Sequence, residues 1–328
     1  MAEESRSTVL VALATNTVIA LAKIAAGVLG GSSAMLAEGA HSVADTFNEV
    51  FLLTSLHKSA RPPDDTHPFG YGKERFFWSL LAAIGIFVSG SVFSLYQGIT
   101  GLLHGGEETD ALLSYIVLAA AFVAEGTSFL KAWNQLRGEA RRSNRGVWDH
   151  IKRSTDPTVK TVASEDSAAL VGLVLAALGV GLHQLTGQSV WDSAAAIAIG
   201  VLLAVVAFFL GRDTKEMLIG EAVDPELRAE LMQELESFPE VDAVVDLLSM
   251  RLGPEDSLLA VRLDLVDGLS SDEVERVSSR IDRELQTRHP EITQVFLDAT
   301  RASARQRSEA YERGEERQRH EAEHLTEE

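Results

Sequence analysis

The sequence predicts an α-helical membrane protein in which six transmembrane helices precede a cytosolic α+β domain with the ferredoxin-like order αββαβ. Two observations support this prediction. Six apolar runs lie before Arg212, each close to the roughly 20 residues that cross a bilayer, whereas the chain after Asp213 is charged and has no such run. We therefore expect a six-helix transmembrane domain over residues 1–212, a cytosolic domain over 213–300, and a charged tail, disordered or a frayed helix, over 301–328.

The predicted spans are residues 8–30, 33–56, 76–104, 111–133, 159–185 and 190–211. An even number of spans leaves both termini on the same side of the membrane. The loops after the second and fourth spans contain all ten Lys and Arg residues of the connections between spans. Because basic loops stay in the cytosol, we expect both termini to face the cytosol.

The amino-terminal residues lack the cleavage site of a signal peptide and the Arg-rich pattern of an organelle presequence. We accordingly predict a multi-pass protein of the plasma (inner) membrane of a prokaryote. The chain contains no cysteine, which excludes disulfides, thiolate metal sites and thiol nucleophiles. A metal bound by this chain must therefore use nitrogen and oxygen ligands.

Ionisable side chains concentrate in four of the six predicted spans. The third span has no charged residue before its end, and the sixth has only Asp192 near its entry. The other four spans contain Asn16, Lys23, Glu38, His41, Asp45, Asn48, Glu49, Glu125, Lys131, Glu165 and Asp166. An ionisable group inside a bilayer is costly and usually marks an ion or substrate path. We therefore expect the first, second, fourth and fifth spans to surround a polar interior.

His41, Asp45 and Asn48 have the spacing of metal ligands. They lie at i, i+4 and i+7, so one helix face presents an imidazole nitrogen and two oxygens. Asp166 lies at a similar depth in the antiparallel fifth span. A lone intramembrane His or Asp serves about as often in an interhelical hydrogen bond, but this set, in a chain without nucleotide-binding or nucleophile motifs, favours ion binding. We assign structural roles to Asn16, Lys23, Glu38 and Glu49.

At these residues the sequence resembles the cation diffusion facilitator family over nearly its whole length. The second span contains Ser-Ala-Met-Leu-Ala-Glu-Gly-Ala-His41-Ser-Val-Ala-Asp45, and the loop over residues 64–73 reads Asp-Asp-Thr-His-Pro-Phe-Gly-Tyr-Gly-Lys. Asn16 and Lys23 also match. The stretches Glu165-Asp-Ser-Ala-Ala, Ala-Glu125-Gly and Gly-Leu-Leu-His104 are most similar to the zinc-transporter-nine-like branch.

The resemblance implies a particular metal site. Zinc members of the family bind the ion through two residues of the second span and two of the fifth, the latter in an HxxxD pattern. The matching ligands here are His41, Asp45 and Asp166, while Val162 occupies the position four before Asp166 and cannot coordinate a metal. A fourth ligand must come from Asn48, Glu125, Glu165 or water. Such an oxygen-rich site suits zinc and leaves manganese, cobalt and ferrous iron open.

The implied function is a secondary transporter, not an enzyme, that exports a divalent cation from the cytosol in exchange for protons. Zn²⁺ or Mn²⁺ is then the substrate, with Zn²⁺ favoured, and no prosthetic group is expected. Metal and protons compete because ligands must be deprotonated to coordinate. Alternatives are an exporter of Mn²⁺, Co²⁺ or Fe²⁺ with the same fold, a nontransporting membrane metal sensor or scaffold, and a carrier of an organic cation, which would need a larger pocket.

Some members of the resembled family hold a second metal in the loop after the second span, through an Asp and two His. Asp64 and His67 match this pattern, but the third position is Tyr71. The alternative is a cytoplasmic loop that packs against the tail domain through Phe69, Tyr71 and Arg75.

The charged half has the pattern of a small layered domain. Helices are expected at residues 225–238 and 270–288, and strands at 243–252, 258–266 and 292–297. The resemblance implies that this domain pairs with a second copy to form a homodimer. Between Asp213 and Thr300 there are 22 Asp and Glu against 8 Lys and Arg, which disfavours nucleic acid as a partner.

Overall fold

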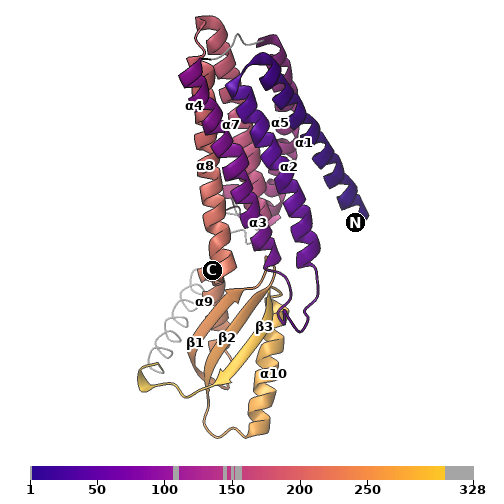
Figure 1. Cartoon of the computed structure of the whole chain (residues 1–328). Helices are drawn as coiled ribbons and strands as arrows, with labels where there is room; N and C mark the ends of the chain where they lie inside the picture. Colours follow the sequence, from indigo (N-terminus) through magenta and orange to yellow (C-terminus); the bar gives the residue numbers. More distant parts are fainter. Residues whose placement is uncertain (1, 106–110, 143–145, 149–150, 152–156, 307–328) are drawn as a thin grey trace, which may run out of the picture. The chain divides into compact units, whose positions relative to one another are not determined.

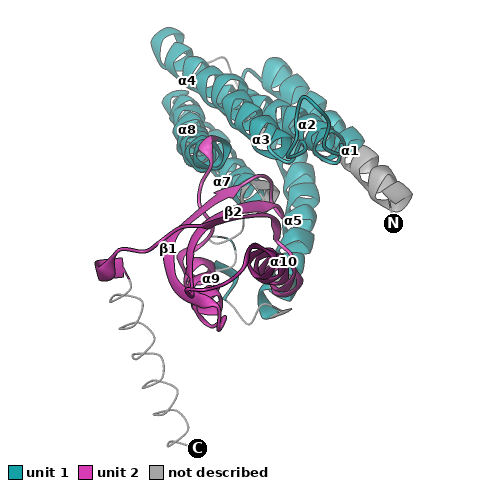
Figure 2. Cartoon of the chain, turned by 90° about the horizontal axis from the view of Figure 1, so that it is seen from below, with its two compact units in different colours: residues 1–218 teal, residues 219–328 magenta. Residues whose placement is uncertain are grey.

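The structure is a computed structural model that describes residues 2–105, 111–142, 146–148, 151 and 157–306. The chain divides into two compact units, residues 1–218 and 219–328, coloured teal and magenta in Figure 2. The predicted tail over 301–328 is described only as far as residue 306, so its remainder lies outside the described residues.

The first unit is a bundle of long helices (Figure 1). They are α1 (Ala2–Gly30), α2 (Ser33–Ser59), α3 (Glu74–Gly85), the π-helical η1 (Ile86–Val92), α4 (Phe93–His104), α5 (Ala111–Arg142), α7 (Pro157–Thr186) and α8 (Val190–Ile219). The segments α3, η1 and α4 continue one another and together form the third predicted span.

Five stretches of the described residues are long and apolar enough to cross a membrane. They are Leu13–Gly30, Glu74–His104, Leu112–Gly138, Ala163–Thr186 and Val190–Ile219. The second predicted span, α2, has 27 residues but lacks the apolar composition, because it contains several polar side chains. These turn inward, with Glu38 0% and His41 1% exposed. The predicted class, a helical membrane domain followed by a small α+β domain, is confirmed.

Helix α2 is the centre of the bundle and contacts α1, α3, η1, α4 and α7. The helices approach closely because small residues face them. A Cβ atom on Gly39 would lie 2.7 Å from Ile24 of α1, and one on Gly172 of α7 would lie 2.2 Å from Oε1 of Glu38. A larger side chain at either glycine would push apart the helices that carry the polar residues.

Asp192 of α8 caps the amino-terminal end of α2. Its Oδ1 accepts a hydrogen bond from the Ser32 hydroxyl at 2.6 Å, and its Oδ2 accepts from the backbone N–H groups of Ser33 at 2.5 Å and Ala34 at 3.3 Å. The Ser32 hydroxyl oxygen in turn accepts from the N–H of Met35. These bonds satisfy N–H groups that a helix cannot satisfy itself, and they tie α2 to α8.

The second unit has the predicted order αββαβ. Its elements are α9 (Pro225–Glu236), β1 (Val241–Arg251), β2 (Ser257–Leu265), α10 (Ser271–Arg288) and β3 (Ile292–Ala299). Strand β1 pairs antiparallel with β2, and β2 pairs parallel with β3. A capping box between Ser270 and Glu273 begins α10. The core lies between the helices and one sheet face, around Leu231, Leu235, Leu247, Leu259, Val261, Ile281 and Leu285.

The loop between α2 and α3 is held together by Asp64. Its Oδ2 accepts a hydrogen bond from the Tyr71 hydroxyl at 2.6 Å, and its Oδ1 accepts from the hydroxyl and N–H of Thr66 and from the N–H of His67. These bonds, led by that of Tyr71, hold the pKa of the Asp64 carboxyl well below its usual range. Both carboxylate oxygens are thus engaged within the loop, which disfavours a second metal site at Asp64.

We predict that Tyr71→Phe raises the pKa of Asp64 toward the ordinary aspartate value, because the variant removes the largest cause of the depression. A depressed carboxyl pKa stabilises the loop above the ordinary pKa, and that stabilisation is lost as the pH falls through the folded-state value. Carbon NMR titration of Asp-labelled protein measures the shift. Tyr96→Phe, which removes an exposed hydroxyl from α4, is the control. An unchanged Asp64 titration in Tyr71→Phe would refute this account of the loop.

Candidate metal-binding site

His41 and Asp45 lie one turn apart on α2, as their spacing predicts. Nδ1 of His41 lies 3.3 Å from Oδ1 of Asp45, and the two side chains are 1% and 19% exposed. Within the described residues, neither imidazole nitrogen nor Oδ1 of Asp45 has a hydrogen-bond partner. The pair therefore presents free donor atoms to the interior of the bundle.

Asn48 and Glu165 link α2 to α7 through a short hydrogen bond. The Asn48 amide donates to Oε2 of Glu165, and both side chains are buried. The neighbouring Asp166 lies close enough to Asp45 and Glu125 for their charges to interact. The fifth span thus places its two carboxylates beside the second span, at the level that the sequence predicts.

Glu125 of α5 is paired with a cation. The Lys23 ammonium of α1 lies 2.7 Å from Oε1 of Glu125 and 3.0 Å from Oε2 of Glu38, and it donates to the Ser42 hydroxyl at 2.9 Å. Lys23 and Glu38 are completely buried. A buried charge is tolerated when it is paired and hydrogen-bonded, so this cluster of Lys23, Glu38, Ser42 and Glu125 joins three helices. We call it the Lys23 cluster.

A second polar link joins α1 to α2. The Asn16 amide donates to Oε1 of Glu49 at 2.7 Å. Asn16 thus pairs with Glu49, and Lys23 pairs with Glu38. These contacts agree with the structural roles expected for the four residues. Ser42 was not predicted as a site residue from the sequence. Ser42 lies at i+4 from Glu38, and this spacing is the signal that could have placed it in the Lys23 cluster.

Unsatisfied buried atoms mark the candidate site. Within the described chain, buried oxygen and nitrogen atoms without a hydrogen-bond partner include Glu38 Oε1, His41 Nδ1 and Nε2, Asp45 Oδ1, Glu49 Oε2, Glu125 Oε2, Glu165 Oε1 and Asp166 Oδ2. Such atoms are rare in folded proteins, because each is stripped of water without compensation. A cation or a proton would satisfy them, and they come from α2, α5 and α7.

The donor atoms are near one another without forming a closed ligand set. Among the residues that the structure describes, no group of three His, Cys, Asp or Glu side chains converges at a distance suited to one metal ion. The side chain of Val162, which stands where zinc members of the family have His, lies outside the described residues. A bound ion must therefore draw these side chains together or use water as a ligand.

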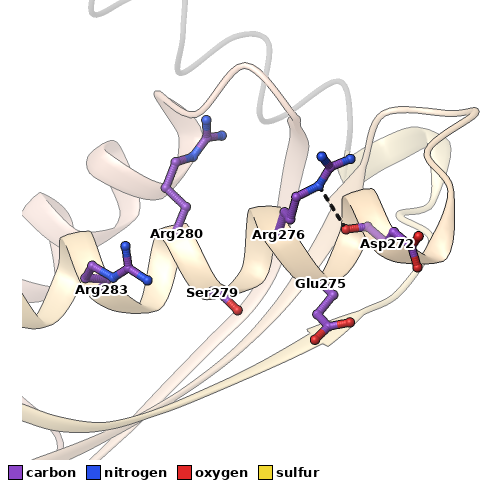
Figure 3. Close-up of a pocket in the computed structure, with 6 residues that line it drawn as sticks. All are labelled: Asp272, Glu275, Arg276, Ser279, Arg280 and Arg283. Carbon is purple, nitrogen blue, oxygen red and sulfur yellow. Dashed lines mark hydrogen bonds between the residues drawn. The ribbon is translucent and has the colours of Figure 1, made fainter.

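A pocket lies elsewhere, along α10 in the second unit. It measures about 540 Å³ and is lined by Asp272, Glu275, Arg276, Ser279, Arg280 and Arg283 (Figure 3). Three arginines among two carboxylates make this surface unsuited to a divalent cation. His289 of this domain pairs with Glu234, with Nε2 2.9 Å from Oε2. The described part of this unit therefore adds no second group of metal ligands.

The chain is similar to a known protein family over most of the first unit. The Cation efflux transmembrane domain family matches residues 9–219. The chain is 38% identical over 245 residues to the mitochondrial proton-coupled zinc antiporter SLC30A9 of Xenopus laevis, an alignment that covers 75% of this chain and 44% of that protein. It is 34% identical to metal tolerance protein C4 of Arabidopsis thaliana, over 77% of this chain and 55% of that protein. The chain thus spans about half the length of these relatives.

A bacterial relative aligns more completely. The manganese efflux system protein MneP of Bacillus subtilis is 26% identical over 295 residues, which cover 89% of this chain and 95% of that protein. The lower identity makes MneP a more distant relative than SLC30A9, although its alignment also includes the second unit.

The predicted prokaryotic plasma membrane is wrong on these comparisons. The more similar relatives are mitochondrial antiporters of vertebrates and a plant protein, and they point to a eukaryotic membrane. The prediction rested on the amino-terminal residues. Targeting signals are read separately from the membrane fold, so the lack of a recognisable presequence pattern does not identify the membrane. The multi-pass character is retained. With its helical membrane domain, its buried carboxylates and these relatives, the chain belongs to the cation efflux (cation diffusion facilitator) family, in the branch of the SLC30A9 zinc antiporters.

Proposed function

We propose that this protein is a secondary transporter that carries a divalent cation, Zn²⁺, across the membrane in exchange for protons. The observation that carries the proposal is the group of unsatisfied buried imidazole and carboxylate atoms on α2, α5 and α7. The names of the relatives support it, since SLC30A9 is a proton-coupled zinc antiporter and MneP is a manganese efflux protein. Its role is transport rather than catalysis.

The proposed ligands are His41, Asp45 and Asp166. His41 and Asp45 share one face of α2 with free donor atoms, and Asp166 lies within electrostatic range of Asp45. Protons bind to the same atoms as the metal, so binding of one releases the other. That competition supplies the exchange, with no nucleotide and no prosthetic group.

Three residues remain candidates for the fourth ligand. Asn48 and Glu165 hydrogen-bond each other, which leaves Oε1 of Glu165 free. Glu125 keeps Oε2 free while Oε1 binds Lys23. We propose Glu125 as the fourth ligand or the proton carrier, because its free oxygen lies on the third helix of the group and its charge interacts with both Asp45 and Asp166.

Manganese is the second candidate substrate. Apart from His41, every proposed donor is an oxygen, and oxygen ligands suit Mn²⁺. The manganese protein MneP is a relative over most of this chain. Zn²⁺ remains the first candidate, since imidazole and carboxylate together suit it.

The second unit is proposed to hold two copies together. Leu248, Ala260 and Phe296 pair across adjacent strands and so share the sheet face opposite the core. Leu248 is 59% and Phe296 52% exposed. Exposed apolar side chains that lie together favour a protein–protein contact, and a second copy of this chain is the proposed partner, giving a homodimer.

We propose a transport domain over residues 1–212 and a dimerisation domain over residues 213–300. Helix α8 continues past the first boundary to Ile219.

We predict that Asp45→Ala reduces zinc efflux from proteoliposomes to the background of protein-free vesicles. The variant removes a ligand, while alanine is well tolerated in a helix. Thr46→Ala is the matched control, because the Thr46 hydroxyl bonds only its own helix, at the Ser42 carbonyl. Parallel assays with zinc, manganese, cobalt and iron rank the substrates. Wild-type flux in a correctly inserted Asp45→Ala protein would refute the site, and wild-type protein that moves none of these metals would refute a transporter.

We predict that Glu125→Gln lowers zinc efflux by about tenfold and shifts the pH dependence of efflux. A loss of about tenfold is the lower end of the activity loss seen when a group that supports a metal site is removed. Glutamine keeps an acceptor for Lys23 but loses the charge and the exchangeable proton. Thr127→Ala, whose hydroxyl bonds the Ala124 carbonyl on the same helix, is the control. Unchanged flux at every pH in Glu125→Gln, with lost flux in Asn48→Ala, would instead make Asn48 the fourth ligand.

We predict that Leu248→Glu converts the detergent-solubilised protein from dimer to monomer, because it places a charge on the exposed apolar sheet face. Light scattering coupled to size-exclusion chromatography measures the mass. Ser279→Glu adds the same charge to the exposed surface of α10 and should leave the dimer intact. A dimeric Leu248→Glu protein would show that the contact between copies lies elsewhere.

A further inference from the structure

An apolar pocket of about 290 Å³ lies in the first unit, apart from the candidate metal site. Its lining includes Trp133, Trp148, Ser164, Ser167, Val171 and Val206. These residues belong to α5, α7, α8 and the short described segment between α5 and α7. Most of them fall within stretches apolar enough to cross a membrane. The pocket therefore opens among helices whose surroundings are lipid.

The pocket and the metal site share helix α7. Ser164 and Ser167, which line the pocket, flank Glu165 and Asp166 in the chain. Successive residues of a helix point about 100° apart, so α7 presents carboxylates to α2 and small side chains to the pocket. An occupant of the pocket would support the helix that carries two site carboxylates.

Aromatic and basic groups lie at one end of this pocket. The rings of Trp133 and Trp148 meet edge to face with centroids 6.1 Å apart, and the Arg137 guanidinium lies over the Trp133 ring at 5.5 Å. Arg137 and Arg141 are exposed, and the same connection contains Arg142, Arg145, Lys152 and Arg153 in sequence. Tryptophan and arginine gather where membrane meets water, and basic residues beside a helical pocket select anionic lipid head groups.

We propose that this pocket binds an anionic phospholipid, with part of an acyl chain among Trp133, Val171 and Val206 and the phosphate on Arg137. The apolar walls favour hydrocarbon, and the exposed Arg137 guanidinium over the Trp133 ring favours a negative group beside the pocket. A zwitterionic lipid would fill the walls, but its head group carries its own cation and competes less well for Arg137. The lipid then braces α7 against α5 and α8. Any effect on flux rests on the proposed transport function, whereas the binding itself does not.

Native mass spectrometry of the full-length, detergent-solubilised protein tests the binding directly. Added phosphatidylglycerol should remain bound at lower concentration than phosphatidylcholine with the same acyl chains. Arg137→Gln should weaken phosphatidylglycerol binding by roughly fivefold, the ~1 kcal/mol that a basic residue contributes near an anionic lipid surface. Val171→Phe, which fills the pocket with a ring, should abolish this binding.

Matched controls separate the pocket from the general surface. Val174→Phe makes the same change on α7 at equal exposure, 48% against 47% for Val171, at a residue that does not line the pocket. Lys131→Gln removes a positive charge from another exposed position of α5. Both should bind phosphatidylglycerol as the wild type does. Equal retention of the two lipids by the wild type, or wild-type binding in both Arg137→Gln and Val171→Phe, would overturn the proposal whether or not the protein moves metal.

Discussion

The rest of the membrane domain depends on one buried cation. The Lys23 ammonium lies in the bundle without exposure to solvent, and its three partners come from α2 and α5. Removing one partner of a buried ion pair costs on the order of 3–5 kcal/mol, because the other charge remains without compensation. That penalty is a large part of the stability of a typical domain. The positions of α1, α2 and α5 are therefore coupled, and the orientation of His41 and Asp45 on α2 depends on this pairing.

The Lys23 cluster also sets the charge of the candidate site. With one cation against Glu38 and Glu125, the cluster retains a negative charge when both carboxyls are ionised. Asp45, Glu165 and Asp166 add further carboxylates nearby, and like charges at short range in a low-dielectric interior repel strongly. Binding of protons or of a divalent cation would reduce this repulsion among the carboxylates. Repulsion among fixed acidic groups is therefore the physical reason for the proposed exchange of metal for protons.

Patterns of local sequence predicted much of the fold. Long apolar runs gave the helices of the first unit their approximate bounds. The run over residues 33–56 predicted α2 (Ser33–Ser59) as well, although that helix carries several polar residues. Strand alternation predicted β1, β2 and β3. In the site, helical spacing brought His41 and Asp45 together, since that relation is local. The contacts of Lys23 with Glu125 and of Asn48 with Glu165 span 102 and 117 residues, and no periodicity encodes such distances. The subcellular location was not predictable either, because transmembrane helices have similar lengths and apolar composition in every membrane.

The cap that Asp192 places on α2 bears on how such a bundle can move. A carboxylate bonded to a hydroxyl and two backbone N–H groups resists separation of the two helices at that end. Helices α2 and α8 should then swing as a single lever, with the fulcrum at the Asp192 end and the larger displacement at the opposite end. The proposed metal ligands of α2, His41 and Asp45, lie about two and three turns from the fulcrum. They would shift less than the far ends of the helices, so in the proposed transport cycle a bound ion would move less than the ends that open and close.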